Sequence, residues 1–204
     1  MVEVNPEISM RRKAALLEAI AGKNRGLQAN SAQKSAIEAA VEKLELSNPN
    51  PRPVQRLDLL DGDWRLLYTT SRELLNIDRL PLAKLGEIYQ CVRVQSGKIY
   101  NIAELSGLPY LEAVVAVSAG FESESSTRVE IKFDRNITGF QRLIGYQSPE
   151  QLIRAIENGQ SYRYKAIDIS INSDRTGWVE ITYLDHDLRI GRGNQGNIFV
   201  LTRT

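Results

Sequence analysis

The sequence predicts a mainly β protein: an antiparallel β-barrel of about eight or nine strands, with a helical hairpin before it and one short helix inserted in it. Two observations predict this fold. Apolar residues recur at spacings of three and four through the first third of the chain, and from Leu57 onward they recur at spacings of two in short runs. An open antiparallel sheet of this many strands would expose its edges, so a closed barrel is favoured over a two-sheet sandwich.

The first predicted element is the helical hairpin. Gly22 and Gly26 separate its two helices, and Asn30 or Ser31 can cap the second one. Helices of about four turns are marginally stable alone, so we expect their apolar stripes to pack against the rest of the chain. These stripes comprise Ile8, Leu16, Leu17, Ile20, Ile37, Val41 and Leu44.

A proline-rich spacer follows, because "SNPNPRP" removes backbone donors and forces extended conformations. The predicted organisation is therefore a hairpin over residues 1–46, a spacer over 47–56 and a barrel over 57–204, with the helices packed on the barrel as one structural domain.

The barrel region contains about nine runs with the two-residue period of half-buried strands. In the first run, "DWRLLYTTS", we expect Trp64, Leu66 and Tyr68 to share one face. The later runs are residues 88–94, 99–105, 111–119, 129–133, 166–171, 179–184, 188–190 and 198–202.

One short helix is predicted among the strands, in "SPEQLIRAIENG". Ser148 can cap it, Pro149 suits the first helical position, and Gln151 completes a capping box. Gly159 ends it, so the helix is predicted over residues 149–158.

Composition excludes several functional classes. The 26 basic and 25 acidic residues give a net charge of +1, which provides no bulk attraction for nucleic acid. The single cysteine, Cys91, excludes an internal disulfide and is predicted to be a buried small apolar residue. No apolar stretch reaches the roughly 18 residues of a membrane span, and "MVEVNPEISM" has no feature of a signal or transit peptide. We therefore expect an intracellular chain with at most peripheral membrane contact.

Near the C-terminus, Gly191, Gly193 and Gly196 have the G-x-G-x-x-G spacing of dinucleotide-binding loops. Such a loop must lead from a strand into a helix, but only eight residues follow Gly196, and Ile198 to Leu201 predict a closing strand. The glycines are therefore predicted to form a turn or bulge between two antiparallel strands.

The only histidine, His186, lies between Asp185 and Asp187. This triplet has two interpretations: a metal or acid–base site, or the polar turn of a hairpin between Tyr183-Leu184 and Leu188-Ile190. The turn is favoured, and we predict no catalytic residue, no metal site and no cofactor.

Three arginines near the C-terminus also have two interpretations. Arg189, Arg192 and Arg203 could receive a phosphate or carboxylate head group. Alternatively, they could pair with nearby aspartates or stack on Trp64, and this structural use is the commoner one.

Four segments of the chain resemble the plastid lipid-associated protein family, also called fibrillins, which includes cyanobacterial members. They are "LDGDWRLLYTTS", "GEIYQCV", "YNIAEL" and, most specifically, "YLDHDLRIGRGNQGNIFVL". The upstream "LLEAIAGKNRG", "LEL" and "NPNPRP" resemble the family's N-terminal region, so the likeness covers nearly the whole chain.

The resemblance implies a lipocalin-like barrel that binds or organises lipids, carotenoids or prenylquinones without catalysis. It implies a place on the cytoplasmic side of the thylakoid membrane or in the soluble cytoplasm of a cyanobacterium, or in the stroma or plastoglobules if the chain is a mature plant protein. By position, the family's C-terminal signature corresponds to Tyr183, Asp185, Asp187, Arg189 and Arg192. His186 stands where many relatives carry an acid, which weakens a carboxylate-based metal site.

An eight-stranded barrel can be filled by side chains or can hold one small ligand, and both alternatives stay open. The residues predicted to bind the ligand are Trp64, Leu66, Tyr68, Ile99, Val115, Phe133, Tyr183 and Phe199, and Val117, Ile169 and Ile181 are expected on the same inner face.

Two other functions are kept as alternatives. A lipocalin-fold chromophore lyase or isomerase would use Asp185, His186 and Arg189 as its candidate groups, and a structural scaffold would bind a protein partner instead. The hairpin is expected to plug one barrel end or to present residues 11–13 to a membrane or protein.

Overall fold

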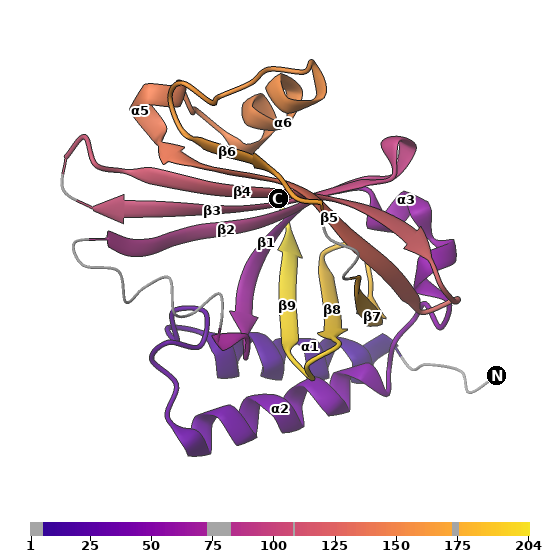
Figure 1. Cartoon of the computed structure of the whole chain (residues 1–204). Coiled ribbons are helices and arrows are strands. Elements are labelled where there is room, and N and C mark those ends of the chain that lie inside the picture. Colours follow the sequence, from indigo (N-terminus) through magenta and orange to yellow (C-terminus); the bar gives the residue numbers. More distant parts are fainter. Residues whose placement is uncertain (1–5, 73–82, 108, 173–175) are drawn as a thin grey trace.

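The computed structural model describes residues 6–72, 83–107, 109–172 and 176–204, and its centre is a closed antiparallel barrel (Figure 1). Eight strands follow the order β4-β3-β2-β1-β9-β8-β7-β5, and pairing between β4 and β5 closes the ring. A ninth strand, β6, pairs with the C-terminal half of β5. The predicted barrel is therefore confirmed. The strands are β1 Gly62–Thr69, β2 Ala83–Arg93, β3 Lys98–Gly107, β4 Ala113–Ser123, β5 Arg128–Phe140, β6 Ile167–Ser170, β7 Gly177–Leu184, β8 Leu188–Gly193 and β9 Ile198–Arg203.

The predicted helical hairpin consists of α1, Pro6–Ile20, and α2, Ser31–Glu45. Asn30 caps α2, one of the two caps that the sequence indicated, and it also forms a capping box with Gln33. Both helices lie across the outer face of β1, β9 and β8, seen at the bottom of Figure 1. Their apolar stripes complete a buried cluster with these strands, which includes Leu16, Ile20, Ile37, Val41, Leu44, Leu188, Ile190, Ile198 and Val200.

The opposite outer face is covered by two short helices, α5, Gln141–Ile144, and α6, Pro149–Glu157. The predicted cap of α6 is present, because Ser148 accepts a hydrogen bond from the Gln151 N–H at 3.2 Å. The capping box predicted with Gln151 is incomplete, because the Gln151 side chain forms no hydrogen bond with the Ser148 backbone in the described part of the chain. A second buried cluster lies beneath these helices, and Cys91 is fully buried in it as predicted. Its other members are Tyr100, Ile102, Val114, Ala116, Ile137, Ile144, Leu152, Ile153 and Tyr162.

A third buried cluster fills much of the barrel interior, with residues from seven of its strands and from the spacer. Two short elements seal one end of the barrel. They are the 3₁₀ turn η1, Pro53–Gln55, and the helix α3, Leu57–Leu60. A further 3₁₀ turn, η3, Val94–Ser96, joins β2 to β3. Val54, Leu59 and Leu60 belong to the interior cluster, so the proline-rich spacer contributes to the core of the barrel.

Register shifts correct two predictions about which face a side chain occupies. The pairing of β1 with β9 shifts between Leu66 and Tyr68, and the added residue moves Tyr68 to the outer cluster beneath the helices. A shift in β7 between Ile181 and Tyr183 moves Tyr183 to the same cluster. The prediction that Tyr68 shares a face with Trp64 and Leu66 is therefore wrong, as is an interior place for Tyr183.

Two further residues also differ from the interior prediction. Phe133 lies beside the register shift between β4 and β5 and is 38% exposed. Ile169 is 54% exposed, because β6 pairs only with the C-terminal half of β5, past the part that pairs with β7, and forms no part of the closed ring.

The glycine-rich segment forms a turn between antiparallel strands, as predicted. Gly191 and Gly193 belong to β8, and the Gly193 N–H donates to the carbonyl of Asn197 at 2.9 Å. Gly196 has a φ of 74°, a left-handed conformation that a glycine adopts without strain. No helix follows, so the segment lacks the geometry of a dinucleotide-binding loop.

Candidate functional site

The barrel interior is the candidate binding site, and its wall is mainly apolar. Leu66 and Ile99 are buried there, as predicted for interior residues. Val115 and Phe199 also pack against this core but remain partly exposed. Phe199 pairs with Thr69, the last residue of β1, so it lies toward the end of the barrel away from α3. Solvent therefore reaches apolar side chains of the interior wall on that side.

Trp64 forms the floor of this interior at the end sealed by α3. Its side chain is fully buried, and Nε1 donates to the carbonyl of Leu60 at 3.0 Å. Arg203 lies over the indole ring, 4.3 Å from the centroid, and donates to the carbonyls of Leu59, Asp61 and His186. Because its donors are used on backbone carbonyls, Arg203 acts as a structural cap on the floor.

Arg189 is the unusual charged group of the interior. It is 5% exposed, and its guanidinium also lies over Trp64, 4.8 Å from the centroid. Nη2 donates to Oε1 of Gln90, and the Gln90 amide donates to Asn101 at 2.9 Å. No carboxylate of the described residues forms an ion pair with Arg189. Burial lowers the pKa of Arg189 to about 9, and the nearby Arg203 acts in the same direction.

Gln90 and Asn101 were missed by the sequence analysis. Both occupy the inner face, because each alternates with residues of the interior cluster along β2 and β3. The signal was present in the sequence: each interrupts an apolar inner face with an amide. A polar side chain at such a position serves a hydrogen-bond network, here with Arg189.

The C-terminal signature residues Asp185, Asp187 and Arg192 lie outside this interior. Arg192 forms a bidentate pair with Glu45 of α2, with N–O distances of 2.9 and 2.8 Å. This pairing fastens the hairpin to the barrel. The structural interpretation of Arg192 is therefore confirmed, with a glutamate as its partner where the sequence suggested an aspartate.

Asp185 organises the turn between β7 and β8. It accepts hydrogen bonds from the backbone N–H groups of Asp187 and Leu188, from the hydroxyl of Tyr183 at 2.7 Å and from Lys13 of α1 at 2.9 Å. Burial by itself raises the pKa of Asp185, but the bonds from Lys13 and Tyr183 outweigh it and the pKa lies below its ordinary value.

The turn interpretation of the Asp-His-Asp triplet is thus confirmed. No group of three or more metal-ligating residues occurs within the described part of the chain.

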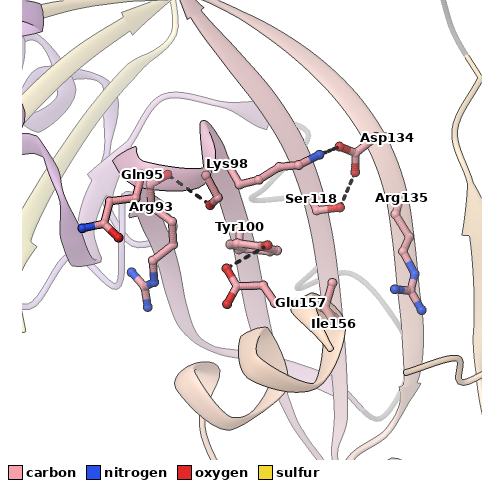
Figure 2. A pocket seen from close by; sticks show the side chains of 10 residues that line it. Arg93, Gln95, Lys98, Tyr100, Ser118, Asp134, Arg135, Ile156 and Glu157 are labelled. Atoms are coloured by element: carbon pink, nitrogen blue, oxygen red, sulfur yellow. Dashed lines mark hydrogen bonds and ion pairs between the residues drawn. The ribbon is translucent and has the colours of Figure 1, made fainter. Parts of the chain in front are cut away.

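Two hollows lie outside the barrel interior. The larger one has a volume of about 630 Å³ and lies beside α6 (Figure 2). The smaller one, of about 260 Å³, lies between the hairpin loop and β1. Among the described helices, none combines the length and the hydropathy needed to cross a membrane.

The up-and-down arrangement of eight strands around an apolar interior, sealed at one end by a tryptophan, defines a lipocalin-like barrel protein. The comparison with protein families gives the particular family. The PAP_fibrillin family model matches residues 10–202, and the chain belongs to this family.

Several plant proteins are similar to the chain. Plastoglobulin-1, chloroplastic, of Pisum sativum is 36% identical over 94% of this chain and 60% of its own length. The chromoplast-specific carotenoid-associated protein of Cucumis sativus is 31% identical over 98% of the chain and 70% of its own length. The probable plastid-lipid-associated protein 1 of Arabidopsis thaliana is 31% identical over 97% of the chain and 70% of its own length.

The chain thus spans 60 to 70% of the length of these relatives. No solved structure matches it significantly.

Proposed function

We propose that the barrel binds a hydrophobic small molecule, such as a lipid, a carotenoid or a prenylquinone, and holds it without catalysing a reaction. The observation that carries this proposal is the apolar interior wall that solvent still reaches at Val115 and Phe199. When an apolar ligand binds, each Å² of apolar surface removed from water contributes about 25 cal/mol to the free energy of binding, before entropy losses are subtracted. The carotenoid and lipid associations in the relatives' names support the same class of ligand.

Arg189 favours a ligand whose polar end is an anion or a strong hydrogen-bond acceptor. A buried guanidinium without a carboxylate partner is costly, and an anionic or strongly accepting head group would offset this cost. The amides of Gln90 and Asn101 lie in the same network and can adjust to an acceptor. Arg189 is thus the head-group residue of the proposal, whereas Arg192 and Asp185 hold the helices on the barrel.

We place this activity at thylakoid or plastoglobule-like lipid surfaces, with the plastid locations in the relatives' names as support. The enzymatic alternative receives no support from the geometry. The Asp185 carboxylate already accepts four hydrogen-bond donors that organise the turn.

The proposal is tested by identifying the small molecule that co-purifies with the protein. The chain is purified under mild conditions from a photosynthetic host, extracted with organic solvent and analysed by absorbance-coupled mass spectrometry. We expect a near-stoichiometric apolar molecule, reduced in a Phe199→Trp variant that fills the wall and unchanged in a Leu46→Trp control at a position 80% exposed. An extract without any such molecule, from protein with a native unfolding midpoint, would contradict the proposal.

A further inference from the structure

The larger hollow lies outside the barrel, between the C-terminal end of α6 and the outer face of β3, β4 and β5. Figure 2 shows Tyr100 on its floor, Lys98 and Asp134 on one side and Ile156 and Glu157 of α6 on the other. It is a hollow of about 630 Å³ that is widely open to solvent and lined mainly by polar and charged side chains. The lining residues are Arg93, Gln95, Ser96, Lys98, Tyr100, Ser118, Asp134, Arg135, Ile156 and Glu157.

Every cation in this lining already has a carboxylate partner. Arg93 pairs with Asp63 at 2.7 Å, and Lys98 pairs with Asp134, which also accepts from Ser118. Arg135 forms a bidentate pair with Asp168 at 2.8 Å. The hollow is therefore crowded with charged groups but has no unbalanced positive charge, so an anionic ligand would have to compete with carboxylates that are already in place.

The ion pairs leave much hydrogen-bonding capacity unused. Arg93 donates through Nη1, and Arg135 through Nε and Nη2, so Nη2 of Arg93 and Nη1 of Arg135 have no partner among the described residues. The side-chain amide of Gln95 likewise has no hydrogen bond within the described chain. Donors therefore remain available around the hollow.

An acceptor remains available as well. Glu157 accepts a hydrogen bond from the Tyr100 hydroxyl through Oε1, at 3.3 Å, and Oε2 is unused among the described residues. Burial raises the pKa of Tyr100 to about 12, and Glu157 acts in the same direction. The hydroxyl therefore stays protonated and holds the Glu157 carboxylate in place as an acceptor.

We propose that this hollow binds a sugar ring, an uncharged ligand with several hydroxyl groups. Each hydroxyl both donates and accepts a hydrogen bond, so a sugar can use the free N–H groups and the free carboxylate oxygen without breaking an ion pair. A free sugar and the head group of a glycolipid both present this chemistry, and the two arms of the test distinguish them. The site is separate from the barrel interior, so its test does not depend on the proposed barrel ligand.

The test is a titration of the isotope-labelled chain, followed by NMR, with methyl glucoside, galactoside and mannoside in turn. Binding is expected at concentrations on the order of 1 mM, with shifts confined to residues around the hollow. The second arm measures co-sedimentation with phosphatidylcholine vesicles that do or do not contain a glycosyl diacylglycerol. Shifts with a glycoside indicate a site for free sugar, and binding only to the glycolipid vesicles indicates a head-group site.

The variant Gln95→Ala/Glu157→Gln is expected to weaken binding about tenfold. It removes the unused amide and the unused carboxylate oxygen, but it keeps an acceptor for the Tyr100 hydroxyl and all ion pairs of the lining. The matched control is Arg154→Gln, on the exposed side of α6 and outside the lining. Both variants should keep the wild-type urea midpoint within error. The proposal is overturned if neither glycosides nor glycolipid vesicles bind, if inorganic phosphate binds in their place, or if the double variant binds like the wild type.

Discussion

The two outer faces of the barrel are covered by helices in different ways. On the face of α1 and α2, apolar side chains meet in a continuous buried cluster, and the ion pairs of Lys13 with Asp185 and Arg192 with Glu45 fasten the helices to the strands. On the face of α5 and α6, the buried cluster ends at a polar hollow of about 630 Å³. There the ion pair of Lys98 with Asp134 lines the hollow itself.

The helices of the hairpin face serve to cover the barrel, whereas the α6 face keeps a surface that can bind a ligand. Along the hairpin face, the polar side chains that fasten the helices and the spacer bond to strands and turns of the barrel. Asn48 and Asn50, for example, donate to the carbonyls of Thr182 and Leu184 at 2.9 and 2.7 Å. Along the α6 face, Arg93, Arg135 and Gln95 keep donors that no described residue uses. Mutations of buried or paired residues on either face are therefore expected to act through stability, and mutations of the unpaired groups that line the hollow are expected to act through ligand binding.

The largest effect is expected from Leu44→Ala in α2. Leu44 is fully buried between the hairpin and the barrel, and its truncation should reduce the free energy of unfolding by about 2–5 kcal/mol, measured by urea titration. The control Leu46→Ala, at a residue 80% exposed, should stay within about 0.5 kcal/mol of the wild type. A loss below about 1 kcal/mol for Leu44→Ala would mean that the hairpin is not an integral cover of the barrel.

A smaller loss, about 2 kcal/mol, is expected from Asp168→Asn near α6. The Asp168 side chain is 5% exposed and accepts from Arg135 and from the Tyr162 N–H at 2.7 Å. The Arg135 hydrogen bond lowers its pKa below the ordinary value.

The contribution of Asp168 should therefore be complete above its unfolded pKa of about 3.9 and disappear as the pH falls through the lower folded value. Urea midpoints of wild type and variant should converge at acid pH. A gap that does not change with pH would contradict this account.

A loss of about 1 kcal/mol or less is expected from Glu45→Gln, which weakens the bidentate pair with Arg192. The two side chains are 16% and 32% exposed, so salt should screen part of the interaction. Urea titrations at low and high ionic strength measure both effects. In the fully surface-exposed pair, Arg11→Gln should leave the midpoint unchanged, since Arg11 and Glu7 are 79% and 66% exposed.

The reactivity of Cys91 measures how tightly α6 covers the barrel, and it requires no mutation. The thiol is fully buried, and burial raises its pKa well above the ordinary value. Native protein should therefore resist a thiol-specific reagent, and unfolding in urea should make the cysteine reactive. Rapid modification of the folded chain would show that the α6 cover opens readily.

Much of the fold was predictable from the sequence, because local patterns determine it. The apolar periods predicted the hairpin and the strands, and Ser148 with Pro149 predicted where α6 begins. Register shifts were not predictable, since they depend on how two strands pair. For this reason the interior places expected for Tyr68 and Tyr183 were wrong.

The site was predictable only in part. The sequence offered stacking of Arg189 and Arg203 on Trp64 as one of two interpretations, and the structure contains it. The burial of Arg189 without a carboxylate partner could not be predicted, because it depends on how distant strands come together. The polar hollow was missed altogether. Its lining comes from β2, η3, β3, β4, β5 and α6, and no local motif joins residues so distant in sequence.

The most direct test of the barrel proposal is a fluorescence titration with cis-parinaric acid, a polyene fatty acid, and with its uncharged methyl ester. In a Trp178→Phe background, Trp64 is the one remaining tryptophan, so quenching of its emission reports a ligand near the barrel floor. We predict saturable quenching by both compounds, with the acid bound about tenfold more tightly and that preference lost in Arg189→Met. Absence of saturable quenching by either compound would contradict a ligand-binding interior.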